Sequence, residues 1–81
     1  MPHADAEVWL RKAVSNAPRP LPKGRFPALM AAARRHGLSH DALMDVLDRW
    51  LNYGYCRITE HINNDIEVLP EGYAYFYRTL P

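Results

Sequence analysis

The fold of this chain is decided by residues 29–51, which read LMAAARRHGLSHDALMDVLDRWL. Apolar residues recur at helical spacing on both sides of Gly37, so the stretch predicts two amphipathic helices joined by a turn. Glycine adopts the left-handed conformation that ends a helix at little cost. Ala33 is small enough for two helices to cross closely, and Leu43 is the first core residue of the second helix. The stretch therefore predicts two helices that pack across a tight turn.

Capping signals set the bounds of these two helices. Backbone N–H groups in the first turn of a helix make no intrahelical hydrogen bond, so proline, which has no N–H, is well tolerated there. Pro27 therefore predicts the first helix over 27–36. Ser39 is a natural N-cap, and Asp41 lies in the first turn, where the helix dipole favours a negative charge. The second helix is therefore expected over 39–53.

This second helix has one apolar stripe and one acidic face. The stripe consists of Leu43, Val46, Leu47 and Trp50. Its largest member, Trp50, is predicted to be the central core residue between the helix and the strands that follow. The outer face consists of Asp41, Asp45, Asp48, Arg49 and Asn52.

A further helix precedes the pair. Residues 4–16 place Trp9 and other apolar side chains at helical spacing, which predicts a helix with Trp9 in the core. Residues 17–26 interleave three prolines with basic residues, so they predict a stiff basic arm without regular hydrogen bonding.

A β-hairpin is expected over 55–69. Cys56, Ile58 and Ile62 should share its inner face, and the turn at Asn63-Asn64-Asp65 suits positive backbone φ angles. The acidic residues around the hairpin are interpreted as solvated charges, and they are Glu60, Asp65 and Glu67.

The segment 70–80 leaves two alternatives open. Pro70 and Glu71 suit a first helical turn, which favours a helix that buries Phe76. The alternating tyrosines of 73–77 would instead suit a third strand. We favour the helix.

Composition bounds the class of protein. With 81 residues, 48% of them hydrophobic, the chain is expected to form one domain, 1–81, around one core. One cysteine excludes an internal disulfide and suits a reducing compartment. The sequence shows neither a basic and then apolar leader nor the roughly 18 apolar residues of a membrane span. We therefore expect a soluble cytoplasmic protein without a membrane partner.

Neither a catalytic site nor a metal or cofactor site is predicted. His36 and His40 are separated by the turn at Gly37, so they cannot form a metal pair on one helix face. Cys56 could pair with a histidine as a nucleophile, but no third residue supports that chemistry. The four glycines form no phosphate-binding loop. The expected protein is not an enzyme.

The order of these elements resembles the winged-helix (winged helix-turn-helix) superfamily over about residues 4–80. The resemblance is carried by Leu47, the Tyr53-Gly54-Tyr55 step, Ile66 and the segment Val68-Leu69-Pro70-Glu71-Gly72. It implies an α+β fold: three helices, a hairpin wing and a short C-terminal aromatic helix or strand. In DNA-binding members, the third helix enters the major groove and the wing tip, here residues 62–65, touches phosphates or the minor groove. The resemblance thus implies a small DNA-binding regulator of the transcription-regulator type.

Charge is divided unevenly along the chain. Residues 1–38 hold seven basic and two acidic residues, whereas residues 39–81 hold three basic and seven acidic ones. The candidate nucleic-acid contacts are Arg19, Lys23, Arg25, Arg34, Arg35, His40 and Arg49.

The DNA-binding protein could act as a two-fold homodimer. One such module binds DNA with limited affinity, and a second copy would contact a second half-site.

The acidic helix also supports a second interpretation. Its three aspartates would be repelled by phosphates, but they would suit a basic protein surface, such as that of a nucleic-acid enzyme. The chain would then be a protein-binding adaptor or inhibitor. Its contact residues would be Asp41, Asp45, Asp48 and Asn52. Arg34 and Arg35 also complement the dipole of the helix that they close, so a structural role for them stays open.

Overall fold

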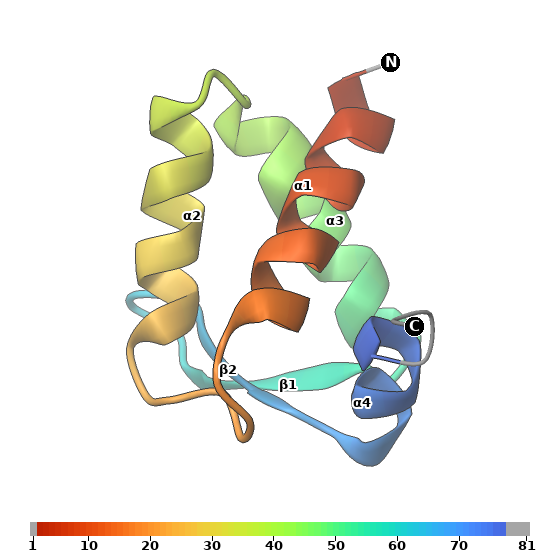
Figure 1. The fold of residues 1–81 in the computed structure, drawn as a ribbon. Helices are drawn as coiled ribbons and strands as arrows, with labels where there is room; N and C mark the ends of the chain where they lie inside the picture. The colour runs from red at the N-terminus through yellow and green to blue at the C-terminus, as the bar shows by residue number, and fades with distance from the viewer. Residues whose placement is uncertain (1, 78–81) are drawn as a thin grey trace.

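A computed structural model describes residues 2–77 of the chain as an α+β arrangement of four helices and one antiparallel hairpin (Figure 1). The elements are α1 (Pro2–Asn16), α2 (Arg25–Arg35), α3 (His40–Asn52), β1 (Cys56–Glu60), β2 (Asp65–Val68) and α4 (Pro70–Tyr77). The expected order of three helices and a hairpin is therefore confirmed. The segment after the hairpin is helical, as favoured, and residues 78–80 of that expected element lie outside the described residues.

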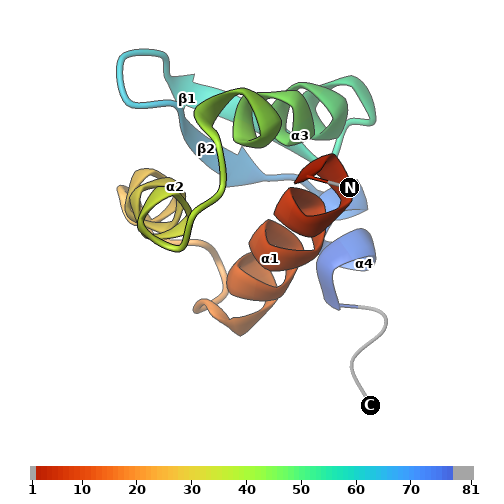
Figure 2. The same ribbon diagram turned by 90° about the horizontal axis from the view of Figure 1, so that it is seen from above.

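Helix α1 lies among the other three helices and contacts each of them (Figure 2). The hairpin lies across the base of this group, with β1 against α3 and β2 against α2. Cys56 pairs with Val68 and Ile58 with Ile66 in the antiparallel register. None of the helices in residues 2–77 is long and apolar enough to cross a membrane.

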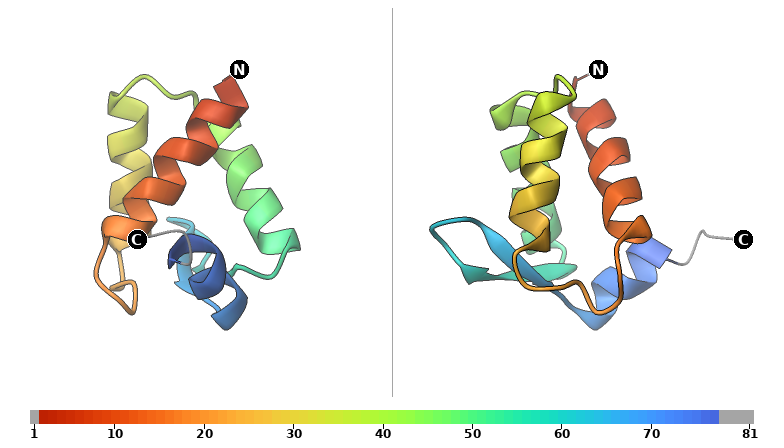
Figure 3. Two further views of the ribbon diagram at one scale, coloured as in Figure 1. Left: turned by 45° about the vertical axis from the view of Figure 1, so that its right-hand side comes forward. Right: turned by 60° about the vertical axis from the view of Figure 1, so that its left-hand side comes forward.

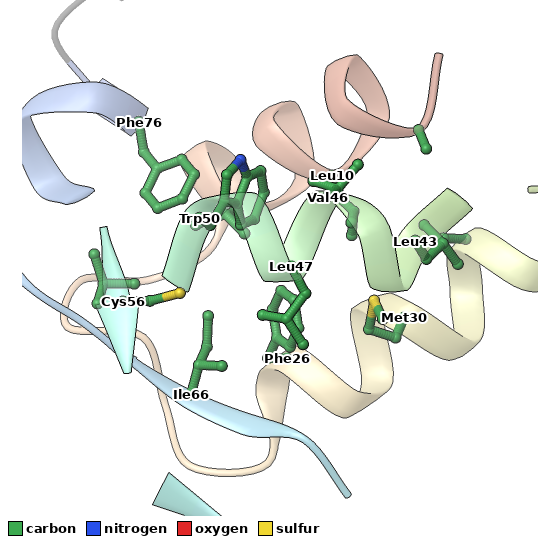
Figure 4. Packing of buried hydrophobic residues seen from close by; sticks show 14 of the residues in the cluster. Leu10, Phe26, Met30, Leu43, Val46, Leu47, Trp50, Cys56, Ile66 and Phe76 are labelled. Carbon is green, nitrogen blue, oxygen red and sulfur yellow. The ribbon is translucent and has the colours of Figure 1, made fainter. Parts of the chain in front are cut away.

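The core gathers side chains from all four helices and both strands, and Trp50 lies at its centre (Figure 4). Trp50 is 0% exposed, and its ring centroid lies 4.8 Å from that of Phe76 and 6.5 Å from that of Phe26. The predicted place of Trp50 at the centre of the core is thus confirmed, but the rings packed around it belong to α2 and α4 and not to the hairpin. Trp9 is half-buried. It packs against the core and lies beside the ring of His36, with 5.9 Å between centroids, so its predicted place in the core is confirmed only in part.

The turn between α2 and α3 is closed as the sequence predicts. Gly37 has a φ angle of +105°, and the backbone N–H of Leu38 donates to the carbonyl of Ala33 over 3.1 Å. The Oγ of Ser39 accepts a hydrogen bond from the N–H of Ala42 over 3.1 Å. These bonds satisfy backbone groups that a helix end leaves without intrahelical partners.

The start of α2 depends on Asp65, which is buried and not solvated as its place near the turn predicts. Asp65 belongs to β2, is 5% exposed, and its Oδ2 accepts a hydrogen bond from the N–H of Gly24 over 2.7 Å. Its Oδ1 accepts from the N–H of Ile66 over 3.0 Å. A negatively charged carboxylate at a helix N-terminus also interacts favourably with the positive end of the helix dipole. Helix α2 accordingly begins at Arg25, before the expected Pro27.

Ile62 does not lie on the inner face of the hairpin. Strand β1 ends at Glu60, and the register shifts between Ile58 and Glu60. Such an irregularity changes the alternation of side chains along a strand. Ile62 therefore falls in the turn and is 90% exposed, which corrects the expectation.

Replacing Asp65 with alanine is expected to destabilise the protein by about 1–3 kcal/mol, because the N–H groups of Gly24 and Ile66 lose the buried carboxylate that accepts from them. Urea unfolding followed by circular dichroism measures the loss. Glu67→Ala is the matched control, since Glu67 is an exposed strand neighbour that forms a surface ion pair with Arg57 over 2.6 Å. Surface pairs of this kind contribute about 0–1 kcal/mol. Equal stability of the two variants would show that Asp65 does not hold the start of α2.

Candidate nucleic-acid interface

One hollow of about 250 Å³ lies between α2, the first residue of α3 and the tip of the hairpin. We call it the tip hollow. Its lining residues are Pro27, Met30, Arg34, His40, Ile62, Asn63 and Asn64. The turn that carries the last three residues projects beyond α2, as the right-hand view of Figure 3 shows. Two of the predicted nucleic-acid contacts, Arg34 and His40, are thus brought together with the predicted wing tip.

The position of the tip is fixed by Asn64. This residue has a φ angle of +58°, the left-handed conformation that asparagine tolerates better than most side chains. Its Nδ2 lies 3.9 Å from the Sδ of Met44 on α3 and donates a weak hydrogen bond to it. The hairpin tip and α3 are therefore linked directly.

The rim of the tip hollow carries positive charge from two sources. Arg34 and its neighbour Arg35 are exposed in the last turn of α2. His40 is exposed at the N-terminus of α3, where the helix dipole adds a partial positive charge. Together these groups make a surface that a phosphate can approach.

The other basic residues of the arm are not gathered at this hollow. The guanidinium of Arg19 lies over the ring of Tyr77, with 4.2 Å between Cζ and the ring centroid. Lys23 lines a separate hollow between the arm and the hairpin, together with Glu60 and Glu67. Arg25 is exposed at the opposite end of α2 from Arg34. The predicted basic arm is thus dispersed over several surfaces.

Arg49 is engaged within the molecule. Its Nε lies 3.4 Å from Oδ2 of Asp45, and its Nη1 lies 3.6 Å from Oε1 of Glu7 on α1. The charge of Arg49 is therefore offset by two carboxylates. Asp41 is exposed in the first turn of α3, next to His40, and Asp48 and Asn52 are exposed further along the helix, so acidic side chains extend along its outer face from the N-terminal end.

Glu7 connects three helices, and its neighbours are distant in sequence. Its Oε2 accepts hydrogen bonds from the Tyr75 hydroxyl over 2.7 Å and from Trp50 Nε1 over 3.4 Å. Burial, the hydrogen bond to Glu7 and the charge of Glu7 raise the pKa of Tyr75 to about 12, and the charge of Arg11 opposes part of that rise. Glu7 therefore holds α1, α3 and α4 together, a role that no local sequence pattern indicates.

The single cysteine of the chain is placed unfavourably for nucleophilic catalysis. Cys56 is buried, and burial raises its pKa to about 11, so the thiol stays protonated at neutral pH. Among the side chains that the structure describes, residues 5–77, no group of three histidine, cysteine, aspartate or glutamate residues could hold a metal ion.

Comparison with protein-family models, with curated proteins and with solved structures finds no match to this chain. The fold by itself does not determine a function. The function of this chain is therefore inferred from the tip hollow and from the charges around it.

Proposed function

We propose that this chain is a non-catalytic DNA-binding module of winged-helix architecture that regulates transcription and contacts duplex DNA at the tip hollow. The observation that supports the proposal most strongly is that Arg34, His40 and the hairpin tip line one hollow. A projecting hairpin beside the N-terminus of a helix is the arrangement that winged-helix domains present to DNA.

Phosphate contacts supply most of the affinity of such a module. Arg34 provides a full cation, and the N-terminus of α3 provides backbone N–H groups and a favourable dipole. Asn63, exposed at the tip, adds a hydrogen-bonding side chain. These groups come from three elements, so the fold of the whole domain sets the spacing between them.

The aspartates of α3 determine how the DNA would approach. Asp41 and Asp48 are exposed, whereas Asp45 is half-buried and paired with Arg49. A DNA groove that received the middle of α3 would meet uncompensated negative charge. We therefore propose that Arg34, His40 and the hairpin tip meet the DNA, that the rest of the outer face of α3 does not, and that Asp41 beside His40 opposes part of the attraction.

Arg34→Gln is expected to weaken binding to a random-sequence duplex about tenfold, because one charged hydrogen bond to phosphate is lost. Fluorescence anisotropy at low salt measures the change. Arg57→Gln is the matched control, since Arg57 is an exposed arginine that pairs with Glu67 on the hairpin and lies outside the tip hollow. Equal affinity of the Arg34 and Arg57 variants would contradict the proposed contact surface.

The exposed aspartates favour a second candidate function, an adaptor or inhibitor that binds a basic protein through α3. The double variant Asp41→Asn with Asp48→Asn separates the two. If DNA is the partner, removing two repelled charges tightens binding to the duplex. If a basic protein is the partner, the same changes slow its association and leave DNA binding absent.

A further inference from the structure

The outer face of α1 carries an exposed stripe that the proposed function does not use. Its residues line one shallow hollow of about 470 Å³ and are Asp5, Val8, Trp9, Lys12, Ala13 and Asn16. Val8 is 66% exposed, and Trp9 is half-buried beside it. Helix α1 lies in front of α2 and α3 in the left-hand view of Figure 3. Val8 and the accessible part of Trp9 give this helix face an apolar centre.

The charges on this stripe are arranged symmetrically about its apolar centre. Asp5 and Lys12 are seven residues apart, which is nearly two helical turns and places them on the same face. The midpoint between them falls between Val8 and Trp9. A negative charge on one side of the centre is thus matched by a positive charge at the same distance on the other side.

We propose that the chain forms a two-fold symmetric homodimer through antiparallel packing of α1 against the α1 of a second copy. A two-fold interface requires a patch that is complementary to itself. With the axis between Val8 and Trp9, Asp5 lies opposite the partner's Lys12, and Lys12 lies opposite the partner's Asp5. Val8 then packs against the partner's Trp9, so apolar groups meet at the centre and opposite charges meet at the rim.

The charges and the apolar centre of this helix face suit a second copy of the chain better than DNA. A DNA backbone would be repelled by Asp5 and would leave Val8 exposed. One helix face is small beside the roughly 800 Å² per partner of a standard interface, so the dimer should be weak, with a Kd of the order of micromolar to hundreds of micromolar. The proposed dimer does not rest on the proposed DNA binding, since no residue of this stripe lines the tip hollow.

Sedimentation velocity of the full chain from about 5 μM to 1 mM is the first test, since this range brackets the expected Kd. The weight-average mass should rise from monomer to dimer. Val8→Glu should weaken dimerisation at least about tenfold, because a charge replaces the apolar centre of the interface. Ile62→Glu is the matched control, since Ile62 is a strongly exposed apolar side chain that lies on the hairpin tip, away from α1. A wild-type chain that stays monomeric, or equal effects of the two substitutions, would overturn the proposal.

Charge exchange tests the antiparallel register. Asp5→Lys and Lys12→Asp should each weaken self-association, because each places like charges opposite one another. Mixing the two variants should restore association as a heterodimer, since every charge then faces its opposite. Circular dichroism confirms that each variant remains helical. A mixture that associates no better than either variant alone would overturn this packing.

Discussion

Replacing Trp50 with alanine is expected to remove a large part of the protein's stability. The indole is 0% exposed, and aromatic rings of α2 and α4 surround it at centroid distances of 4.8 to 6.5 Å. Truncating a fully buried tryptophan costs about 3–5 kcal/mol, a large part of the roughly 5–15 kcal/mol that stabilises a whole domain. The Glu7 carboxylate would also lose the donor at Trp50 Nε1.

Urea unfolding followed by circular dichroism measures this effect. Trp50→Phe is the control, because phenylalanine keeps an aromatic ring in the core but cannot donate to Glu7. We expect the phenylalanine variant to lie between the wild type and the alanine variant in free energy of unfolding. An alanine variant that melts within a few degrees of the wild type would show that Trp50 does not organise the core.

Replacing Gly72 with alanine is expected to destabilise the protein, although helix propensity alone predicts the opposite. Gly72 is a buried residue of α4, and alanine would favour a helix by about 1 kcal/mol over glycine. A Cβ atom at this position, however, would collide with the backbone carbonyl of Tyr55 and lie 2.9 Å from Cγ1 of Val68. Backbone cannot move aside as a flexible side chain can, so overpacking of about 1–3 kcal/mol or more should prevail.

The sign of the change in melting temperature decides between these effects. Ala74→Gly supplies the control for propensity, because Ala74 is exposed in the same helix and should lose about 1 kcal/mol when replaced by glycine. Gly72→Ala should lose at least as much. A Gly72→Ala variant with a raised melting temperature would show that α4 does not pack closely on Tyr55.

The local parts of the fold could be predicted from the sequence because their causes are local. Gly37 ends α2, Ser39 caps α3, and Pro70 with Glu71 begins α4, each through contacts within a few residues. The stripe that contains Trp50 follows from helical periodicity alone. These signals set the order of the elements and the centre of the core.

The parts that could not be predicted depend on contacts between distant segments. Asp65 is buried because its carboxylate meets the N–H of Gly24, which lies 41 residues earlier. Ile62 is exposed because an irregularity in the strand register moves it into the turn. Arg49 pairs with Glu7 across two helices, so its availability to DNA could not be judged from the exposed face of α3. In each case the sequence shows the charge or the apolar group but not the partner.

Binding of the wild-type chain to a fluorescently labelled random-sequence duplex, measured over a series of salt concentrations, tests the proposed function most directly. The logarithm of the binding constant should fall linearly with the logarithm of the salt concentration, with a slope of about −0.9 for each phosphate contacted. Arg34→Gln should reduce the magnitude of that slope by about one contact. Absence of binding at the lowest salt, or a slope that Arg34→Gln leaves unchanged, would contradict DNA binding at the tip hollow.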